Sequence, residues 1–365
     1  MKFSFSSEQD EFRSNLRRFL TDRAPVKETR RLMETDTGWE REGWKALNAE
    51  LGLTAVRIPE EYGGHGFGFG EHCIVLEEMG RALVCAPYFA TTVLAAGAIL
   101  HAGNDERKAA LLPGIASGDT VATLASVEDG GSWDAESTTL TASATGRLNG
   151  HKSFVLDGHT ADLIVVLARG PSGLAFYTVD GNAAGLTRRL LKTMDPTRKL
   201  ARLTFSDVEG TLLGSAAGAY ERVMIEAAVC LSNEMVGGAE RLREDSLAYS
   251  MMRMQFGKAI ASFQSMKHKA ADMLLDVELA KSSAYYAAAA LDDGDEDIAA
   301  MASLAKACAS DAYSQTATHA IQIHGGIGFT YDNDTHLWYK RAKSSDVLFG
   351  DAFYHREQMM KTWAA

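Results

Sequence analysis

The sequence predicts a mainly helical α+β fold in which an antiparallel β domain lies between two helical domains. Apolar residues recur with the spacing of amphipathic helices up to about Gly118, and again from Ala217 onward. Between these regions the chain consists of short runs rich in Val, Ile, Leu, Thr and Phe, broken at close intervals by Gly, Asp, Asn and Pro. The 365 residues exceed what one typical core requires. We therefore expect three domains, at residues 1–118, 119–216 and 217–365.

The first domain is expected to be helical from about Ser7. The stretch SEQDEFRSNLRRFLTDRA opens with a serine that can cap a helix, and it places Phe12, Leu16 and Leu20 on one face. Three further stretches have helical spacing: TGWEREGWKALNAELG, FGEHCIVLEEMGRAL and NDERKAALLPGIASG. A glycine-rich loop, IPEEYGGHGFGFG, precedes the second of these helices.

The middle domain is expected to be a β barrel or β sandwich. Its strands are predicted within DTVATLASV, TLTASATGRLNG, KSFVLDG, DLIVVLARG, GLAFYTVD and KLARLTFSDV. After Ala217 the spacing indicates a long helix towards Met254, followed by helices in QSMKHKAADMLLDVELAKSSAYYAAAAL, in DDGDEDIAAMASLAKACASDAYSQTATHAIQIHG and from HLWYKRAKSSDVLFG onward. The last domain is therefore predicted to be a four-helix bundle.

The composition disfavours several classes of partner. The net charge is -11, whereas a nucleic-acid surface needs a basic footprint. The N-terminus has no signal-peptide pattern, and no apolar stretch approaches the ~18 residues of a membrane span. We expect a soluble cytoplasmic protein. The scattered cysteines predict buried thiols rather than a metal site or disulfides; they are Cys73, Cys85, Cys230 and Cys308.

The stretch IQIHGGIGFT places three glycines within four positions after a long helix. Alone, such a run is more often a tight turn than a ligand site. Together with RMQFGK, FQ and MKH earlier in the bundle, it resembles the C-terminal domain of the acyl-CoA dehydrogenase family. The resemblance extends along nearly the whole chain, through IPEEYGGHGFG, ASVEDGGSWD, GHKSFVLDGHTADLIVVLA and HLWYKRAK.

The resemblance implies that FAD is bound between adjacent subunits. A pyrophosphate needs backbone N–H donors at close range, without side chains in the way. By resemblance, the turn residues contact the adenosine-pyrophosphate part of a flavin held mainly by the other subunit; they are Gln322, Gly325 and Gly326. The long helices supply the other contacts, from Arg253, Phe256 and Gln264, and the planar fork of an arginine suits a diphosphate.

In the β domain, the loop from Ser126 through VEDGGSWD resembles the loop that covers the flavin and the acyl thioester. Phe154 stands where the family has an aromatic wall on the flavin, although a phenylalanine of the sandwich core has the same pattern. Leu156 occupies a position that usually carries a flavin-binding hydroxyl. That contact is therefore expected to be missing or to come from the backbone.

The reaction implied by the resemblance removes a proton α to a thioester while hydride leaves the β carbon, giving a trans-2-enoyl thioester. A carboxylate must act as the base. The two family positions for it fall on Phe349 and Ala227, and neither is acidic. Asp351 and Glu226 lie near them in the sequence and are candidates.

A third possibility is that this chain has no base, as in one subunit type of the α2β2 acyl-CoA dehydrogenases of actinobacteria that act on steroids. The function implied by the resemblance is FAD-dependent α,β-dehydrogenation of an acyl-CoA, by this chain or by a mixed oligomer that contains it. The family's usual electron acceptor is an electron-transfer flavoprotein. A flavin monooxygenase or nitroalkane oxidase of the same fold has no positive sign in the sequence.

Overall fold

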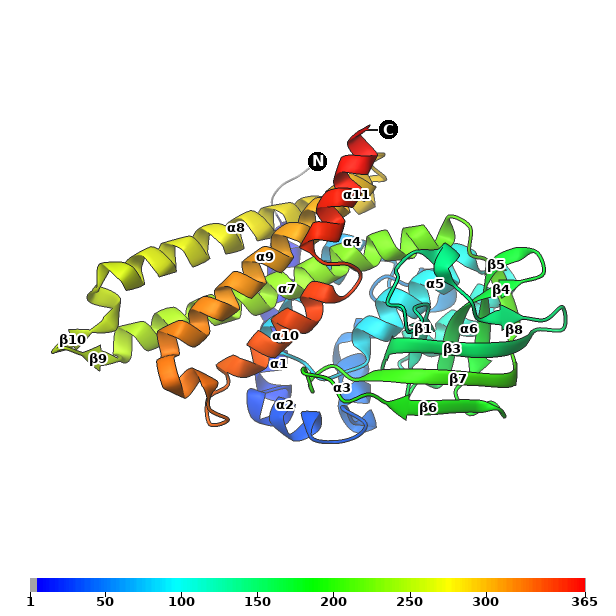
Figure 1. Cartoon of the computed structure of the whole chain (residues 1–365), viewed down its shortest axis with the longest axis horizontal. Coiled ribbons are helices and arrows are strands. Elements are labelled where there is room, and N and C mark those ends of the chain that lie inside the picture. Colours follow the sequence, from blue (N-terminus) through cyan, green and yellow to red (C-terminus); the bar gives the residue numbers. More distant parts are fainter. Residues whose placement is uncertain (1–4, 365) are drawn as a thin grey trace. The chain divides into compact units, whose positions relative to one another are not determined.

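The computed structural model describes residues 5–364, which form two compact units (Figure 1). The first unit combines the chain up to Thr29, Phe69–Val84 and the chain from Ala228 onward. The second combines Arg30–Gly68 and Cys85–Ala227. Both units are thus assembled from separated stretches of sequence, and the three predicted domain boundaries stay a prediction.

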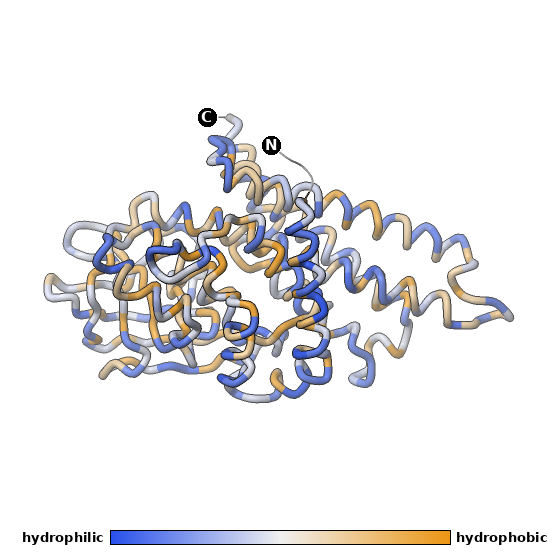
Figure 2. Tube along the Cα trace, turned by 180° about the vertical axis from the view of Figure 1, so that it is seen from behind, coloured by the Kyte–Doolittle hydropathy of each residue, from blue (hydrophilic) through white to orange (hydrophobic). Residues whose placement is uncertain are grey.

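The first unit is a bundle of helices. The longest pair, α8 and α9, run side by side (Figure 1). Hydrophobic and hydrophilic residues alternate along α8 (Figure 2), as expected of a helix with one buried side. The helices are α1 (Ser7–Arg23), α4 (Phe69–Ala82), α7 (Ala219–Met252, in this unit from Ala228), α8 (Gln264–Asp293), α9 (Ile298–His324), α10 (Thr335–Val347) and α11 (Ala352–Ala364). The predicted helical bundle is confirmed.

Local sequence determines where α1 begins. The Ser6 hydroxyl accepts the backbone N–H of Gln9, and the Gln9 side chain accepts the backbone N–H of Ser6, which forms a capping box. Two arginines of α1 pair with carboxylates of α4: Arg13 lies 2.5 Å from Glu77, and Arg17 lies 2.6 Å from Glu78. Since both glutamates are buried, these pairs fix α1 on α4.

Two glycines allow α4 and α7 to pack closely. A Cβ atom added at Gly80 would lie 2.0 Å from the carbonyl oxygen of Glu234, and one added at Gly237 would lie 1.9 Å from that of Glu77. Any larger residue would push the two backbones apart. The reciprocal pattern indicates that glycine is needed on both helices at their crossing.

The second unit contains a mixed sheet and several short helices. Its α-helices are α2 (Val26–Met33, which starts in the first unit), α3 (Arg41–Leu51), α5 (Ala96–Ala102) and α6 (Asp105–Ala116), and a π-helix, η3 (Phe89–Ala95), precedes α5. The strands are β1 (Ala122–Ala125), β2 (Thr141–Ala142), β3 (Arg147–Leu156), β4 (Leu163–Gly170), β5 (Gly173–Asp180), β6 (Leu186–Leu190), β7 (Leu200–Glu209) and β8 (Thr211–Ser215). The middle β region is confirmed.

The strand order is β6-β7-β3-β2-β4-β5-β8, and β1 pairs with β4. Most pairs are antiparallel, as predicted, whereas β4 pairs in parallel with β1 and β2. Two parallel neighbouring strands need a long connection. Here the connecting chain itself forms other strands of the sheet. Apolar side chains including Leu148, Ile164 and Leu203 form the core on one side of this sheet. None of the described helices combines the length and the apolar content that a bilayer span requires.

Candidate functional site

The link between α7 and α8 presents the predicted residues Arg253 and Phe256 to the surface. Strands β9 (Met254–Gln255) and β10 (Lys258–Ala259) form a hairpin with a two-residue turn. Phe256 and Gly257 form the turn with φ of 51° and 75°, which is the pattern of a type I′ turn. The Phe256 ring is 90% exposed, although phenylalanine rarely adopts a positive φ. An exposed aromatic ring on strained backbone indicates a contact with another molecule.

Arg253 is also available for a contact. It follows the last residue of α7, and its backbone N–H donates to the carbonyl of Tyr249 at 2.9 Å. Its side chain is exposed and has no hydrogen-bond or ion-pair partner within the described part of the chain. Gln264, the first residue of α8, is likewise exposed.

The glycine run forms the turn η6 (Gly325–Phe329) after α9, and its glycines have different roles. Gly325 has φ 66° and ψ -143°, a region that other residues rarely adopt. A Cβ atom at Gly328 would lie 3.1 Å from the carbonyl oxygen of Ile321. A Cβ atom at Gly326 would meet no atom of the residues that the structure describes within 4 Å. The fold therefore explains Gly325 and Gly328, while Gly326 leaves open space against its backbone.

A ring contact brings the end of α9 beside the end of α7. The His324 ring stacks on the Tyr249 ring with centroids 4.3 Å apart. Gln322 and Gly325 lie close to His324 in the sequence, and Arg253 lies one helical turn after Tyr249. The ring contact therefore joins the two predicted cofactor-binding segments. Gln322 is exposed at this end of α9.

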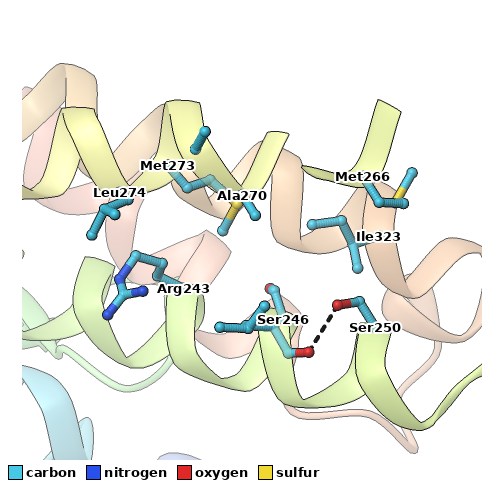
Figure 3. Close-up of a pocket in the computed structure, with 10 residues that line it drawn as sticks. Arg243, Ser246, Ser250, Met266, Ala270, Met273, Leu274 and Ile323 are labelled. Atoms are coloured by element: carbon cyan, nitrogen blue, oxygen red, sulfur yellow. Dashed lines mark hydrogen bonds between the residues drawn. The ribbon is translucent and has the colours of Figure 1, made fainter. Parts of the chain in front are cut away.

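A cavity of about 230 Å³ lies among the same helices (Figure 3). Ser250 lines it from α7, Met266 from α8 and Ile323 from α9. The lining is mostly apolar, and its polar members are Arg243, Ser246 and Ser250. The Ser250 hydroxyl donates to the carbonyl of Leu247. Met266 lies two residues after Gln264, and Ile323 directly follows Gln322. The cavity is thus lined by sequence neighbours of two predicted residues, whereas none of the predicted bundle residues lines it.

The predicted residues of the second unit lie on and next to a β-bulge. The pairing of β3 with β7 shifts register between Lys152 and Val155, and Phe154 within this bulge has φ 56°. The Phe154 ring is 43% exposed, so it does not belong to the sandwich core. Bulges near functional sites redirect side chains in this way. Leu156 is buried, and its carbonyl accepts from the hydroxyl of Thr123 at 2.6 Å.

Buried ion pairs hold the loop that begins at Ser126. The Lys152 ammonium is fully buried and donates to the Ser126 carbonyl at 2.8 Å and to the Glu128 carboxylate at 3.0 Å. Burial lowers the pKa of Lys152 to about 8, against the opposing effect of Glu128. Burial acts to raise the pKa of Glu128, but hydrogen bonds from Thr139, Leu140 and Lys152 outweigh it and lower that pKa to about 2. The loop is therefore anchored to β3 and not free to move.

The two positions at which the family carries its catalytic carboxylate hold buried apolar residues. Phe349 is 6% exposed with φ 60°, and Ala227 is fully buried. Asp351 is exposed, and its Oδ1 accepts the backbone N–H of Tyr354 at 2.8 Å. Asp351 thus caps the start of α11.

Buried side chains bind the backbone carbonyls of the turn between α10 and α11. The buried Lys306 ammonium donates at 3.0 Å to the carbonyls of Asp346 and Gly350, and His355 Nε2 lies 3.0 Å from the Phe349 carbonyl. Burial and the Lys306 charge lower the pKa of His355 to about 4, so His355 is neutral near pH 7 and donates to that carbonyl. This support was not predicted from the sequence.

Glu226 is surrounded by two arginines and a histidine. Its carboxylate is 1% exposed and lies 2.8 Å from Arg57, 2.7 Å from His101 and 3.1 Å from Arg222. Burial acts to raise the pKa of Glu226, yet the His101 hydrogen bond and the charges of Arg57 and Arg222 lower it. A carboxylate held in this way is a poor proton acceptor. The geometry therefore argues against the predicted role of Glu226 as a base.

Comparisons with known proteins identify the family of this chain. The acyl-CoA dehydrogenase N-terminal and C-terminal domain families match residues 6–119 and 218–363. The acyl-CoA dehydrogenase IpdE2 of Mycolicibacterium smegmatis is 32% identical over 358 residues, which cover 98% of both chains. The structure of butyryl-CoA dehydrogenase from Megasphaera elsdenii is 25% identical with a TM-score of 0.92 and covers 100% of both chains. A variant of the steroid ACAD Tcur3481-Tcur3483 is 29% identical with a TM-score of 0.90 and covers 98% of both chains.

Proposed function

Because the chain belongs to the acyl-CoA dehydrogenase family, whose members are oxidoreductases, we propose that it takes part in FAD-dependent α,β-dehydrogenation of an acyl-CoA thioester. We further propose that it does so as a flavin-binding subunit without a base of its own. The observation that carries the second part is the apolar, buried character of Phe349 and Ala227, the two positions where the base was expected.

The remaining carboxylates support a base from another chain. A base must lie within hydrogen-bond reach of the proton that it removes and must be free to accept it. Glu226 is held by two arginines and His101, and Asp351 is engaged at the start of α11. Asp351 is the stronger of the two candidates because it is exposed, and it therefore needs its own test.

The residues of this chain fit FAD in two places. The open space at Gly326 and the unpaired Arg253 guanidinium suit a diphosphate, which the N–H groups of the turn and the arginine fork would bind. The exposed Phe154 ring suits one face of a flavin ring. FAD bound by these residues would supply the acceptor for the hydride that leaves the β carbon. The part of this chain is to bind and orient the cofactor.

An assembly with further chains follows from the same proposal. Apolar side chains are exposed on α8, where solvent gives them no favourable contact: Leu274, Leu275 and Leu279. A second copy or an unlike family member would cover them, and the steroid ACAD that resembles this chain is named for two components. We propose an unlike partner, because a like partner would not supply the base. An electron-transfer flavoprotein would then reoxidise the flavin.

The first experiment measures flavin bound per polypeptide from the visible absorption spectrum. The chain is purified alone and also after co-expression with a family member that carries a glutamate at either base position. We expect little flavin alone, and both flavin and dehydrogenase activity with the partner. About one flavin per chain and activity when purified alone would overturn the proposal of a subunit without a base.

Two variants at Asp351 separate its possible roles. Asparagine keeps an N-cap but cannot accept the proton, whereas alanine also removes the cap. We expect Asp351→Asn to leave turnover of the active assembly unchanged and Asp351→Ala to cost about 1 kcal/mol of stability. Loss of turnover in a folded, flavin-loaded Asp351→Asn assembly would identify Asp351 as the base.

A further inference from the structure

We propose that a second cavity, within the first unit, binds a ring compound that carries one hydrogen-bond donor and no negative charge. The cavity has a volume of about 530 Å³, within the usual range for small-molecule sites. Residues of α1, α4, α7, α8 and α9 line it. It shares no residue with the cavity of Figure 3 or with the predicted cofactor contacts, and the proposal does not rest on the proposed function.

The polar group that points to a ligand is the side chain of Asn233. It is fully buried and lines the cavity from α7. Its Nδ2 donates to the carbonyl of Val229 at 2.9 Å and faces the carbonyl of Ala284 at 3.4 Å. Since both neighbours are acceptors, the amide has only one favourable orientation. Its Oδ1 is then left buried with no hydrogen-bond partner among the described residues. A buried acceptor in this state favours a donor.

Several polar groups of the lining donate to acceptors within the protein. The Ser282 and Ser283 hydroxyls donate to carbonyls of α8. Gln9 donates one of its two Nε2 hydrogens to Glu71 at 2.8 Å and accepts from the Ser6 backbone. Burial raises the pKa of Tyr285, so its hydroxyl keeps a proton, which it donates to Glu77. The cavity therefore offers acceptors to a ligand.

The charge of the lining disfavours an anion. Glu77 contributes a carboxylate that is paired with Arg13. Asp292 contributes a second carboxylate, which accepts the backbone N–H groups of Phe69 and Gly70 at the start of α4. An added negative charge would lie near both carboxylates. A neutral or cationic ligand avoids this repulsion.

The apolar part of the lining suits a flat ring. It includes three aromatic side chains, of Phe5, Tyr285 and Tyr286, and several aliphatic ones, from residues such as Ile74, Ala288, Met301 and Leu304. Aromatic and aliphatic walls contribute burial, and one polar contact fixes the orientation of a ligand. An aromatic ring with one N–H group matches this combination.

The test compares indole with indene, two molecules of nearly the same shape, of which only indole has an N–H donor. Binding to the full-length chain, in the assembly in which it purifies, is measured by isothermal titration calorimetry and ligand-observed NMR. We expect indole to bind about 5- to 10-fold more tightly than indene, as one hydrogen bond to a buried acceptor provides. Equal affinities, or no binding of indole, would overturn the proposal.

Two variants locate the binding. Asn233→Leu removes the acceptor at similar volume and is expected to abolish the preference for indole while leaving indene binding unchanged. Ala289→Phe fills the cavity from a half-buried position and is expected to abolish binding of both. Because Ala289→Phe keeps the Asn233 hydrogen bonds, it tests the site even where Asn233→Leu does not fold. Indole binding that survives Ala289→Phe would place the ligand elsewhere.

The charge requirement is tested with tryptamine and indole-3-acetate, which carry opposite charges on similar substituents. We expect tryptamine to bind at least as tightly as indole and indole-3-acetate more weakly than either. Tighter binding of the acetate would contradict the acceptor-rich, acidic character inferred for this cavity.

Discussion

The imidazole Nε2 of His101 lies 2.7 Å from Oε1 of Glu226, although the two residues are 125 positions apart in the sequence. Arg57 and Arg222 lie beside the same carboxylate, so α5, α7 and the segment before the glycine-rich loop meet at one buried charge. Removing a buried charge from its partners leaves those partners uncompensated. This cluster therefore anchors the fold of the second unit.

Glu226→Gln is expected to lower the free energy of unfolding by about 3 kcal/mol near pH 7, since it breaks a buried ion cluster. The pKa of Glu226 is lowered in the folded state, so its stabilising effect is present above about pH 4.5 and is lost as the pH falls further. Urea unfolding near pH 7 and pH 4 measures the difference between variant and wild type. That difference should shrink at the lower pH.

The control is Glu221→Gln, which changes an exposed glutamate on the same helix. We expect its effect to stay within about 0.5 kcal/mol. If both variants lowered the free energy of unfolding by similar amounts, Glu226 would not anchor the second unit.

Gly326→Leu is expected to reduce flavin occupancy without lowering stability, because a Cβ atom at this position meets no atom of the described residues within 4 Å and the side chain would fill the space against the turn. Gly328→Ala is the matched variant: its methyl group would press on Ile321 and His324, which should lower the melting temperature by several degrees. Absorption spectra and thermal melts of both variants check this. A stable Gly326→Leu protein with full flavin content would remove the turn from the cofactor site.

Phe154→Asn tests the ring on the β-bulge. Asparagine tolerates a positive φ better than phenylalanine, which offsets part of the lost burial, so we expect stability to change by only about 1 kcal/mol. Flavin affinity should fall at the same time because the aromatic wall is gone. The measurements are a thermal melt and flavin retention on dilution. A large loss of stability would indicate that Phe154 belongs to the core after all.

His355→Gln tests the support beneath the turn before α11. Burial and the Lys306 charge lower the pKa of His355 from 6.5 to about 4, so the unfolded chain binds a proton more readily than the folded one between these values. Stability should therefore fall by roughly 3 kcal/mol as the pH drops across this range. Glutamine keeps a donor for the Phe349 carbonyl but does not titrate. Unfolding measured at several pH values should show that His355→Gln lacks this pH-dependent loss of stability. His268→Gln, at an exposed site, should still show it.

Much of the helical fold could be predicted because its helices have one apolar face. The segment from Phe89 to Ala102 could not, because it is buried along nearly its whole length and shows no periodicity. The strands β6 and β8 have five residues each, and polar residues interrupt their patterns. The parallel pairing of β4 with β1 and β2 is a tertiary contact, and the local sequence of a strand does not specify which strand it pairs with.

The cofactor segments could be predicted because glycine and arginine have specific uses next to phosphates. Their meeting through His324 and Tyr249 could not, since a ring stack between two helices leaves no spacing signal. Glu226 was a candidate base because its neighbour aligned with a family position. Of its three partners Arg57, His101 and Arg222, only Arg222, one turn earlier on α7, could be predicted from the sequence. The buried ion pair of Lys152 with Glu128 could not be predicted either, because the polar neighbours His151 and Ser153 give no sign that Lys152 is buried.

The contact between Asp292 and the first turn of α4 has a consequence for biosynthesis. The two partners are 223 residues apart, and at ~5 to 20 residues per second a ribosome needs roughly 11 to 45 s to add the second after the first. During that time α1 and α4 have been synthesised without the later helices of their own unit, and the strands of the second unit are being synthesised. We expect the early helices to be the part of the nascent chain that depends most on chaperones.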